Sequence, residues 1–241
     1  MGKTTIFGHR GVPRKYIENS IDGFEYIAQK GEAVEFDVHL TKDFQPIVMH
    51  DEKIDRTTNG HGYIRDYTVA ELDQFHLMPD LQRPQQRQGK QSAIPTLERV
   101  LQIFQKTDLM LNIELKTENI QYPGIETLVL EAVHRFDLAE QTVFSSANLG
   151  SVKRIGRLDE RQQIALISET PISRPLDFMV RNQLDALHLK RSVMLNEVTD
   201  RQRIWTIDDT PTLKQIFERG YEGVFTDDFE NAHALRQAIG N

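Results

Sequence analysis

Strand-like and helix-like segments alternate along most of this chain, and the alternation limits the folds open to it. Nine short apolar runs are typical of buried strands, and they cover residues 4–10, 33–40, 46–50, 109–116, 142–146, 163–168, 185–190, 203–208 and 222–228. Six further segments have the apolar spacing of helices, namely 20–30, 95–106, 124–136, 148–158, 211–219 and 229–239. Pro95 and Pro211 lie where helices commonly begin, and Gly31 and Gly220 lie where they commonly end.

Strands that alternate with helices predict right-handed βαβ units and a mainly parallel sheet. In a chain of 241 residues, this pattern predicts a closed (β/α)8 TIM barrel, formed as a single domain over residues 1–241. A doubly wound open sheet is the alternative, but no G-x-G-x-x-G motif follows a strand. The polar residues 51–94 predict a loop or insertion after the strand that ends at His50. The span 191–202 is short for a barrel helix with its loops.

Composition excludes several classes of site and partner. The chain has no cysteine, so disulfides, thiolate metal sites and a cysteine nucleophile are excluded. Its net charge is −7 and it has no long basic cluster, which argues against a nucleic-acid partner. No apolar run reaches the roughly 18 to 20 residues that span a bilayer, so we expect no stable membrane anchor and a cytoplasmic location. The oligomeric state stays open.

Carboxylates collect towards the ends of two strand-like runs. Glu35 and Asp37 share one face of the run 33–40, and Glu114 lies on the polar face of the run 109–116. In a barrel these ends meet at the mouth, where two carboxylates about 4 Å apart repel by roughly 4 kcal/mol. A divalent cation would relieve this repulsion, and an all-oxygen ligand set favours Mg²⁺ or Ca²⁺. Structural ion pairs with Arg10 and Lys116 are the alternative.

Two histidines also end strand-like runs. His9 follows the first run and His50 ends the third, so both are candidates for a general acid and a general base. A packed or solvent-facing ring is the alternative for each. Arg10 and Lys116 could hold a phosphate or act as plain salt-bridge partners.

At these residues the sequence resembles the glycerophosphodiester phosphodiesterase family. The matching motifs occur in order along nearly the whole chain: HRG (9–11), ENS (18–20), VEFDVHLTKD (34–43), IVMHDEKIDRTTNGHGYIRDYTVAEL (47–72), IPTLERVL (94–101), NIELK (112–116), WTID (205–208) and GVFTDD (223–228). HRG alone is a weak signal, whereas the ordered set is specific. The resemblance implies a (β/α)8 barrel enzyme of lipid and glycerol metabolism that hydrolyses small glycerophosphodiesters to sn-glycerol 3-phosphate and an alcohol.

The resemblance also implies roles for particular residues. By motif, His9 and His50 are the acid/base pair, and Arg10 contacts the phosphate. The other implied roles are metal ligation by Glu35, Asp37 and Glu114, phosphate binding by Lys116, support of Arg10 or a histidine by Glu18, and packing against glycerol by Trp205. A solvated Glu18 ahead of a helix and a core role for Trp205 are the alternatives.

Other functions remain open at this stage. A related barrel phosphodiesterase could act as a lysophospholipase D or on phosphoinositides, and a non-catalytic barrel could merely bind phosphodiesters. The sequence does not fix the alcohol released. It also leaves open whether a cyclic phosphate forms or water attacks directly.

Overall fold

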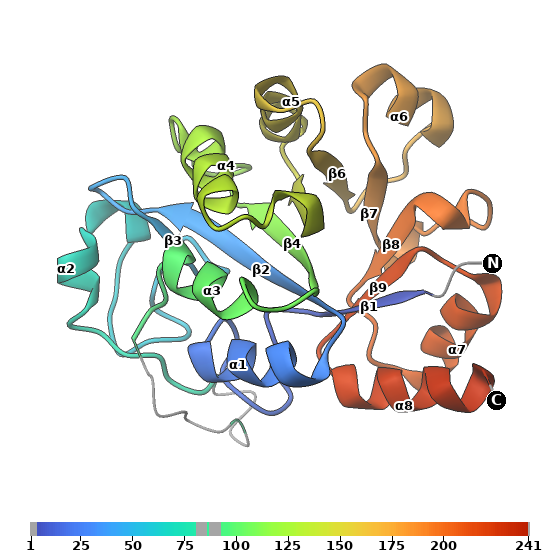
Figure 1. Cartoon of the computed structure of the whole chain (residues 1–241), viewed down its shortest axis with the longest axis horizontal. Coiled ribbons are helices and arrows are strands. Elements are labelled where there is room, and N and C mark those ends of the chain that lie inside the picture. The colour runs from blue at the N-terminus through green and yellow to red at the C-terminus, as the bar shows by residue number, and fades with distance from the viewer. Residues whose placement is uncertain (1–3, 81–85, 87–92, 241) are drawn as a thin grey trace.

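The computed structural model describes residues 4–80, 86 and 93–240, and its centre is a closed barrel of eight parallel strands. The strands are β1 (Thr5–Gly8), β2 (Ala33–Leu40), β4 (Met110–Leu115), β5 (Thr142–Ser146), β6 (Gln163–Ser168), β7 (Ala186–Lys190), β8 (Gln202–Trp205) and β9 (Gly223–Thr226). They pair in the order β1-β9-β8-β7-β6-β5-β4-β2, and β1 pairs with β2 to close the barrel. Helices surround the strands (Figure 1). The predicted (β/α)8 TIM barrel is therefore confirmed.

The outer helices differ from the sequence prediction in one element. They are α1 (Ile21–Lys30), α3 (Leu97–Phe104), α4 (Ile125–Arg135), α5 (Leu149–Leu158), α6 (Pro175–Asn182), α7 (Thr210–Arg219) and α8 (Phe229–Gly240). Helix α6 was not predicted, because Leu176 and Val180 face solvent and weaken its amphipathic pattern. Between β7 and β8, the short span contains only the 3-10 helices η3 (Arg191–Val193) and η4 (Thr199–Arg201). A further 3-10 helix, η2 (Ala139–Gln141), precedes β5.

Side-chain caps fix the starts of several helices at the end of the barrel where the strands finish. The Ser20 hydroxyl accepts a hydrogen bond from the Gly23 amide at 3.2 Å, which begins α1. The Asn148 side chain accepts from the first turn of α5 in the same way. These two caps fix where the helix after β1 and the helix after β5 begin.

The core has two layers, one outside the barrel and one inside it. Outside, Phe24 of α1 packs on Phe36 of β2, with ring centroids 5.6 Å apart. Inside, Phe7 and Phe225 lie 4.8 Å apart near small side chains such as Ala33. Aromatic rings therefore pack inside the barrel, and Phe225 also lines a cavity at the mouth together with polar side chains.

An additional strand and a small subsidiary core lie beside the mouth. Strand β3 (Pro46–Val48) pairs antiparallel with β2, so the strand predicted over 46–50 is shorter and His50 lies just beyond it. The following segment contains η1 (Ile64–Asp66) and α2 (Val69–Leu72). Apolar residues of this segment pack with others before and after it to form a cluster separate from the main core. This cluster consists of Ile17, Ile47, Met49, Ile54, Ile64, Leu72, Leu77 and Ile94. The remainder of the predicted insertion, 81–85 and 87–92, lies outside the described residues.

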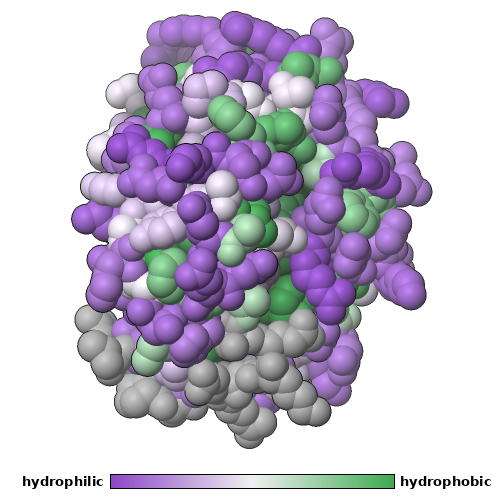
Figure 2. Space-filling model, turned by 90° about the vertical axis from the view of Figure 1, so that its left-hand side faces the viewer, coloured by the Kyte–Doolittle hydropathy of each residue, from purple (hydrophilic) through white to green (hydrophobic). Residues whose placement is uncertain are grey.

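The surface at the end that carries β3 and α2 is mainly hydrophilic, with small and separate hydrophobic groups (Figure 2). Within the described part of the chain, no helix is both long and apolar enough to cross a membrane.

Candidate active site

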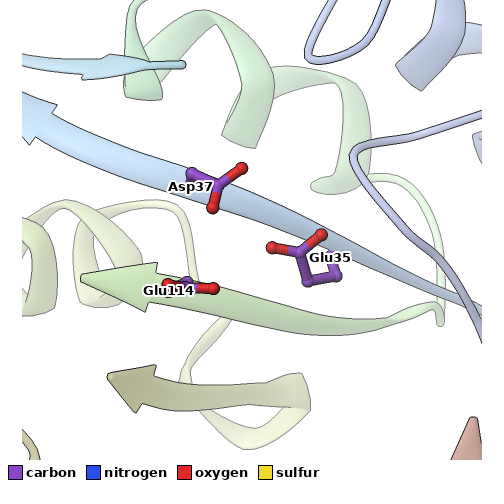
Figure 3. A group of neighbouring side chains, drawn as sticks. All are labelled: Glu35, Asp37 and Glu114. Atoms are coloured by element: carbon purple, nitrogen blue, oxygen red, sulfur yellow. The ribbon is translucent and has the colours of Figure 1, made fainter. Parts of the chain in front are cut away.

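Three carboxylates meet at the mouth on neighbouring strands. Glu35 and Asp37 project from β2, and Glu114 projects from β4 to the same place (Figure 3). The register pairs Asp37 directly with Glu114, which explains how residues 77 positions apart become neighbours. One oxygen from each carboxylate lies within 4.8 Å of the others. The structure therefore brings together all three predicted metal-ligating residues.

Burial makes this cluster electrostatically unusual. Burial and the neighbouring carboxylates Asp37 and Glu114 raise the pKa of Glu35 well above its ordinary value. Burial also raises the pKa of Glu114, although Lys116 opposes the effect. For Asp37, burial acts in the same direction, but the positive charges around it outweigh burial and lower its pKa.

The cluster fits a divalent cation because two of its oxygens have no hydrogen-bond partner. They are Glu35 Oε1 and Asp37 Oδ1, and both are completely buried. A buried carboxylate oxygen without a partner costs free energy, and a hard cation with oxygen ligands would satisfy both atoms.

The turn after β1 is shaped to face this cluster. Arg10 and Gly11 both have positive φ, 52° and 87°, and the Arg10 amide donates to Glu35 Oε2 at 2.9 Å. Gly8 permits the tight approach, because a Cβ there would lie 2.5 Å from the Gly11 carbonyl oxygen. The strand predicted over 4–10 therefore ends at Gly8, because the backbone turns at His9 and Arg10 towards the acidic cluster.

Each candidate acid/base histidine is held by an aspartate. His9 Nδ1 lies 2.7 Å from Asp227 Oδ1, and its Nε2 lies 3.9 Å from Glu35 Oε2. His50 Nδ1 lies 2.6 Å from Asp51 Oδ1. An ionised aspartate accepts a proton-bearing Nδ1, which leaves Nε2 of each ring available for proton exchange.

Glu18 links the two sides of the mouth. Its side chain is buried, and it accepts a hydrogen bond from Arg10 Nη1 at 3.1 Å. It also accepts two hydrogen bonds from Arg56, whose Nε donates to Asp51 Oδ2 at 2.7 Å. Glu18 is therefore not a solvated residue ahead of α1, and Arg56 joins it to the aspartate that holds His50.

A cavity at the barrel mouth is lined by the two candidate acid/base histidines and by Glu35 and Glu114. The predicted substrate-binding side chains line the same cavity. Lys116 Nζ lies 2.8 Å from Glu114 Oε1, and the adjacent carboxylates raise the pKa of its amine against the effect of burial. Trp205 donates its indole N–H to the His188 carbonyl oxygen at 3.0 Å. Its ring therefore forms a wall of the cavity, which Arg10 and Phe225 also line.

Several residues around the site were not singled out from the sequence. Asp227 and Asp51 were part of quoted motifs, but only the fold shows which histidine each one contacts. Asn19 donates to Asp37 Oδ2 at 3.1 Å, and Arg56 reaches the site from the segment beyond β3. The adjacency of Asp51 to His50 was the one local signal available.

Comparison with known proteins identifies the family. A model of the glycerophosphoryl diester phosphodiesterase family matches residues 9–231. The chain belongs to this family. The resemblance seen in the sequence motifs is thereby confirmed, and so is the prediction that this family member is a phosphodiesterase enzyme.

Relatives of this glycerophosphoryl diester phosphodiesterase family member match over nearly its whole length. A glycerophosphodiester phosphodiesterase of Bacillus altitudinis is 33% identical over 247 residues, covering 98% of this chain and 99% of the relative. A glycerophosphodiester phosphodiesterase of Caldanaerobacter subterraneus subsp. tengcongensis is 30% identical over 236 residues, covering 95% of this chain and 96% of the relative. Among solved structures, a phosphodiesterase of Oleispira antarctica in complex with the product sn-glycerol-3-phosphate has a TM-score of 0.85 at 24% identity. The match covers 98% of this chain and 97% of the Oleispira chain. At that identity, the structural likeness supports the fold.

Proposed function

We propose that this enzyme hydrolyses glycerophosphodiesters to sn-glycerol 3-phosphate and an alcohol, with one divalent cation and two histidines. The observation that carries the proposal is the arrangement around the acidic cluster. Glu35, whose Oε1 lacks a hydrogen-bond partner, lines a cavity together with Glu114, the two candidate acid/base imidazoles of His9 and His50, and the cationic side chains of Arg10 and Lys116. The names of the full-length relatives and the product bound to the Oleispira enzyme support the same substrate class.

The cation would be held by Glu35, Asp37 and Glu114. When bound, it would neutralise the carboxylates and act as a Lewis acid towards the phosphate. The donor set consists of oxygens, which favours Mg²⁺ or Ca²⁺.

The cationic side chains bind and orient the phosphodiester in this proposal. Arg10 is fixed by Glu18, so its guanidinium is already oriented before substrate enters. Lys116 is held between Glu114 and Glu118, at 2.8 and 3.3 Å. Both side chains are buried beyond three-quarters of their surface, so their charges act in a poorly hydrated site. The Trp205 ring would pack against the glycerol carbons.

His9 and His50 move the protons. One ring takes the proton from the attacking hydroxyl through Nε2, and the other protonates the oxygen of the departing alcohol. Asp227 and Asp51 hold the rings by Nδ1, so the exchanging nitrogen of each points away from its aspartate.

A panel of glycerophosphodiesters tests the proposal. The assay measures free sn-glycerol 3-phosphate with choline, ethanolamine, glycerol and inositol as the alcohol, before and after chelation. We expect turnover that is lost with chelator and restored by Mg²⁺ or Ca²⁺. A lysophospholipid is included, and cleavage of it alone would instead support a lysophospholipase D.

Matched variants separate chemistry from folding. His9→Ala and His50→Ala should each lower kcat by roughly 10²- to 10⁴-fold. His134→Ala is the control, because this ring lies in the last turn of α4, at the other end of the barrel. Glu114→Gln should weaken cation binding in calorimetry, whereas Glu131→Gln on the exposed side of α4 should not. Full turnover of a sample shown by elemental analysis to lack metal would refute the role of the cation.

A further inference from the structure

A buried histidine that no proposed step uses lines the same cavity. His188 of β7 is 1% exposed and faces the cavity beside Trp205 and Phe225. Its ring lies 4.9 Å from the Phe225 ring. These residues belong to β7, β8 and β9, whereas the carboxylate cluster belongs to β2 and β4. His188 therefore belongs to a different wall of the cavity from the one that would hold the cation.

Arg203 decides which nitrogen of the His188 ring carries the proton. Arg203 Nη1 lies 3.2 Å from His188 Nε2, and its Nη2 donates to Glu222 Oε1 at 2.6 Å. A guanidinium only donates hydrogen bonds, so Nε2 is the acceptor and the neutral ring carries its proton on Nδ1. Burial and the charge of Arg203 lower the pKa of His188 well below its ordinary value, so the ring remains neutral.

The Nδ1–H of His188 is left for a ligand. No hydrogen bond of the described residues uses this atom, and it is not among the fully enclosed side-chain atoms that lack a partner. The indole N–H of Trp205 is already donated to the His188 carbonyl oxygen. The cavity thus offers an uncharged donor beside the aromatic side chains of Trp205 and Phe225.

We propose that His188 is a specificity-determining residue whose Nδ1–H donates to the terminal hydroxyl oxygen of the glycerol moiety. This inference rests on the proposed function. Arg10, Lys116 and the acidic cluster account for the phosphate and its charge. The terminal hydroxyl is the polar group of glycerol farthest from the phosphate, and a neutral donor suits a neutral oxygen. The aromatic side chains on this wall suit the C–H groups of the glycerol chain.

Two near-isosteric substitutions distinguish this role from a purely structural one. In His188→Gln, the side-chain amide reaches the position of Nε2 and can still accept from Arg203, but the donor at Nδ1 is lost. In His188→Asn, the amide nitrogen occupies the position of Nδ1, but the acceptor for Arg203 is lost. If His188 binds the ligand, His188→Gln should impair substrate discrimination more than His188→Asn. If His188 only holds Arg203, His188→Asn should be the more damaging of the two.

The readout is discrimination between two substrates. Glycerophosphocholine is compared with its analogue in which hydrogen replaces the terminal hydroxyl, using kcat/KM for each variant. For the wild type and His188→Asn, we expect the analogue to be roughly 3- to 10-fold poorer, the usual effect of one hydrogen bond. For His188→Gln, we expect the two substrates to be nearly equal. A His188→Gln enzyme that discriminates as strongly as the wild type would overturn the inference.

The outcomes also separate this inference from the proposed function. If the wild type cleaves both substrates equally well, His188 has no such role and the proposed function stands. If it cleaves neither, the proposed function fails and the inference fails with it. Should His188→Gln not fold, as judged by circular dichroism, a crystal structure of the wild type with sn-glycerol 3-phosphate decides. An Nδ1-to-hydroxyl distance near 3 Å would support the inference, and any other partner for Nδ1 would overturn it.

Discussion

His9 Nδ1 lies 2.7 Å from Asp227 Oδ1, which ties the residue after β1 to the residue after β9. The two strands pair in register, with Gly8 opposite Thr226, so the contact follows directly from barrel closure. An aspartate in this position orients the ring and leaves Nε2 towards Glu35. Barrel closure therefore sets the geometry of a proposed proton-transfer group.

We first predict that Asp227→Asn lowers kcat at least about tenfold with little change in KM, because the ring loses its anionic partner and its fixed orientation. Steady-state kinetics on glycerophosphocholine measure this. Asp228→Asn is the control, since that neighbouring side chain accepts from the Asn231 amide in α8. Wild-type kcat in Asp227→Asn would show that the aspartate does not position His9.

The second prediction concerns Arg56, which bonds Glu18 and Asp51 at once. Arg56→Gln should lower the free energy of unfolding by about 2 kcal/mol, because the buried Glu18 loses one of its two cationic partners, at a partly exposed site. It should also lower kcat, since Arg10 and His50 both lose support. Chemical denaturation and steady-state kinetics test this, with exposed Arg65→Gln as the control. Equal stability of the two variants would contradict the prediction.

Sequence periodicity predicted most of the fold because it reports burial. Strand β2, for example, is buried along its whole length, and its alternating pattern placed Glu35 and Asp37 on one face. Helix α6 was missed because two of its apolar residues contact solvent instead of the core. Strand β3 was predicted as a strand, but its antiparallel pairing depends on a hairpin that periodicity does not specify.

The acidic cluster could be predicted because register brings alternating residues of neighbouring strands together. The supporting network could not, because its contacts join loops that are distant in the sequence. Arg56 reaches Glu18 across 38 residues, and Asp227 reaches His9 across 218. Such contacts depend on how the barrel closes and on how the segment beyond β3 packs.

The third prediction uses His39, which is completely buried. Its Nε2 donates to the His50 carbonyl oxygen at 3.1 Å, and its Nδ1 accepts from the Tyr122 hydroxyl at 3.0 Å. Burial lowers the pKa of His39 from 6.5 to about 4. As the pH falls, His39 therefore takes up a proton in the unfolded chain before it does so in the folded protein. The contribution of neutral His39 to the free energy of unfolding is complete above pH 6.5 and is lost between pH 6.5 and pH 4.

For this residue we expect the wild type to lose about 2 kcal/mol more stability than His39→Gln between about pH 7 and pH 5. Denaturant unfolding of both proteins at each pH measures the difference. Glutamine keeps an amide that can donate to the His50 carbonyl, so the comparison isolates protonation from loss of that contact. Parallel stability curves would show that His39 does not carry this pH dependence.

The fourth prediction concerns the protein without metal. In the presence of chelator, Glu35→Gln should raise Tm by several degrees, because it removes a buried carboxyl whose ionisation is disfavoured by burial and by Asp37 and Glu114, and the glutamine oxygen can still accept from the Arg10 amide. Addition of Mg²⁺ or Ca²⁺ should raise the Tm of the wild type and have little effect on the variant. Thermal unfolding with and without each cation tests this. A variant less stable than the wild type in chelator would argue that ion pairs, and not a cation, balance the cluster.

The last prediction separates two routes for the attack on phosphorus. In one, the glycerol 2-hydroxyl attacks to form a cyclic phosphate, with His9 or His50 taking its proton and the other protonating the departing alcohol. Water then opens the ring with the roles reversed. In the other, water attacks the diester directly. Within the first route, nucleophile and phosphorus belong to one bound molecule, which can be worth about 7 kcal/mol or more of barrier.

We expect the first route because of this intramolecular advantage. A covalent enzyme intermediate is not expected, since the sequence has no cysteine and no serine in a G-x-S-x-G turn. A 2-deoxy glycerophosphodiester keeps the phosphate that Arg10 and Lys116 would bind, but it lacks the internal nucleophile. It should therefore inhibit competitively, with an inhibition constant near the KM of the normal substrate, and show no measurable turnover. Phosphorus NMR of the normal reaction should in turn detect the cyclic phosphate under single-turnover conditions. Cleavage of the 2-deoxy analogue at the normal rate would eliminate the cyclic route and leave direct attack by water, with the same two histidines exchanging the protons.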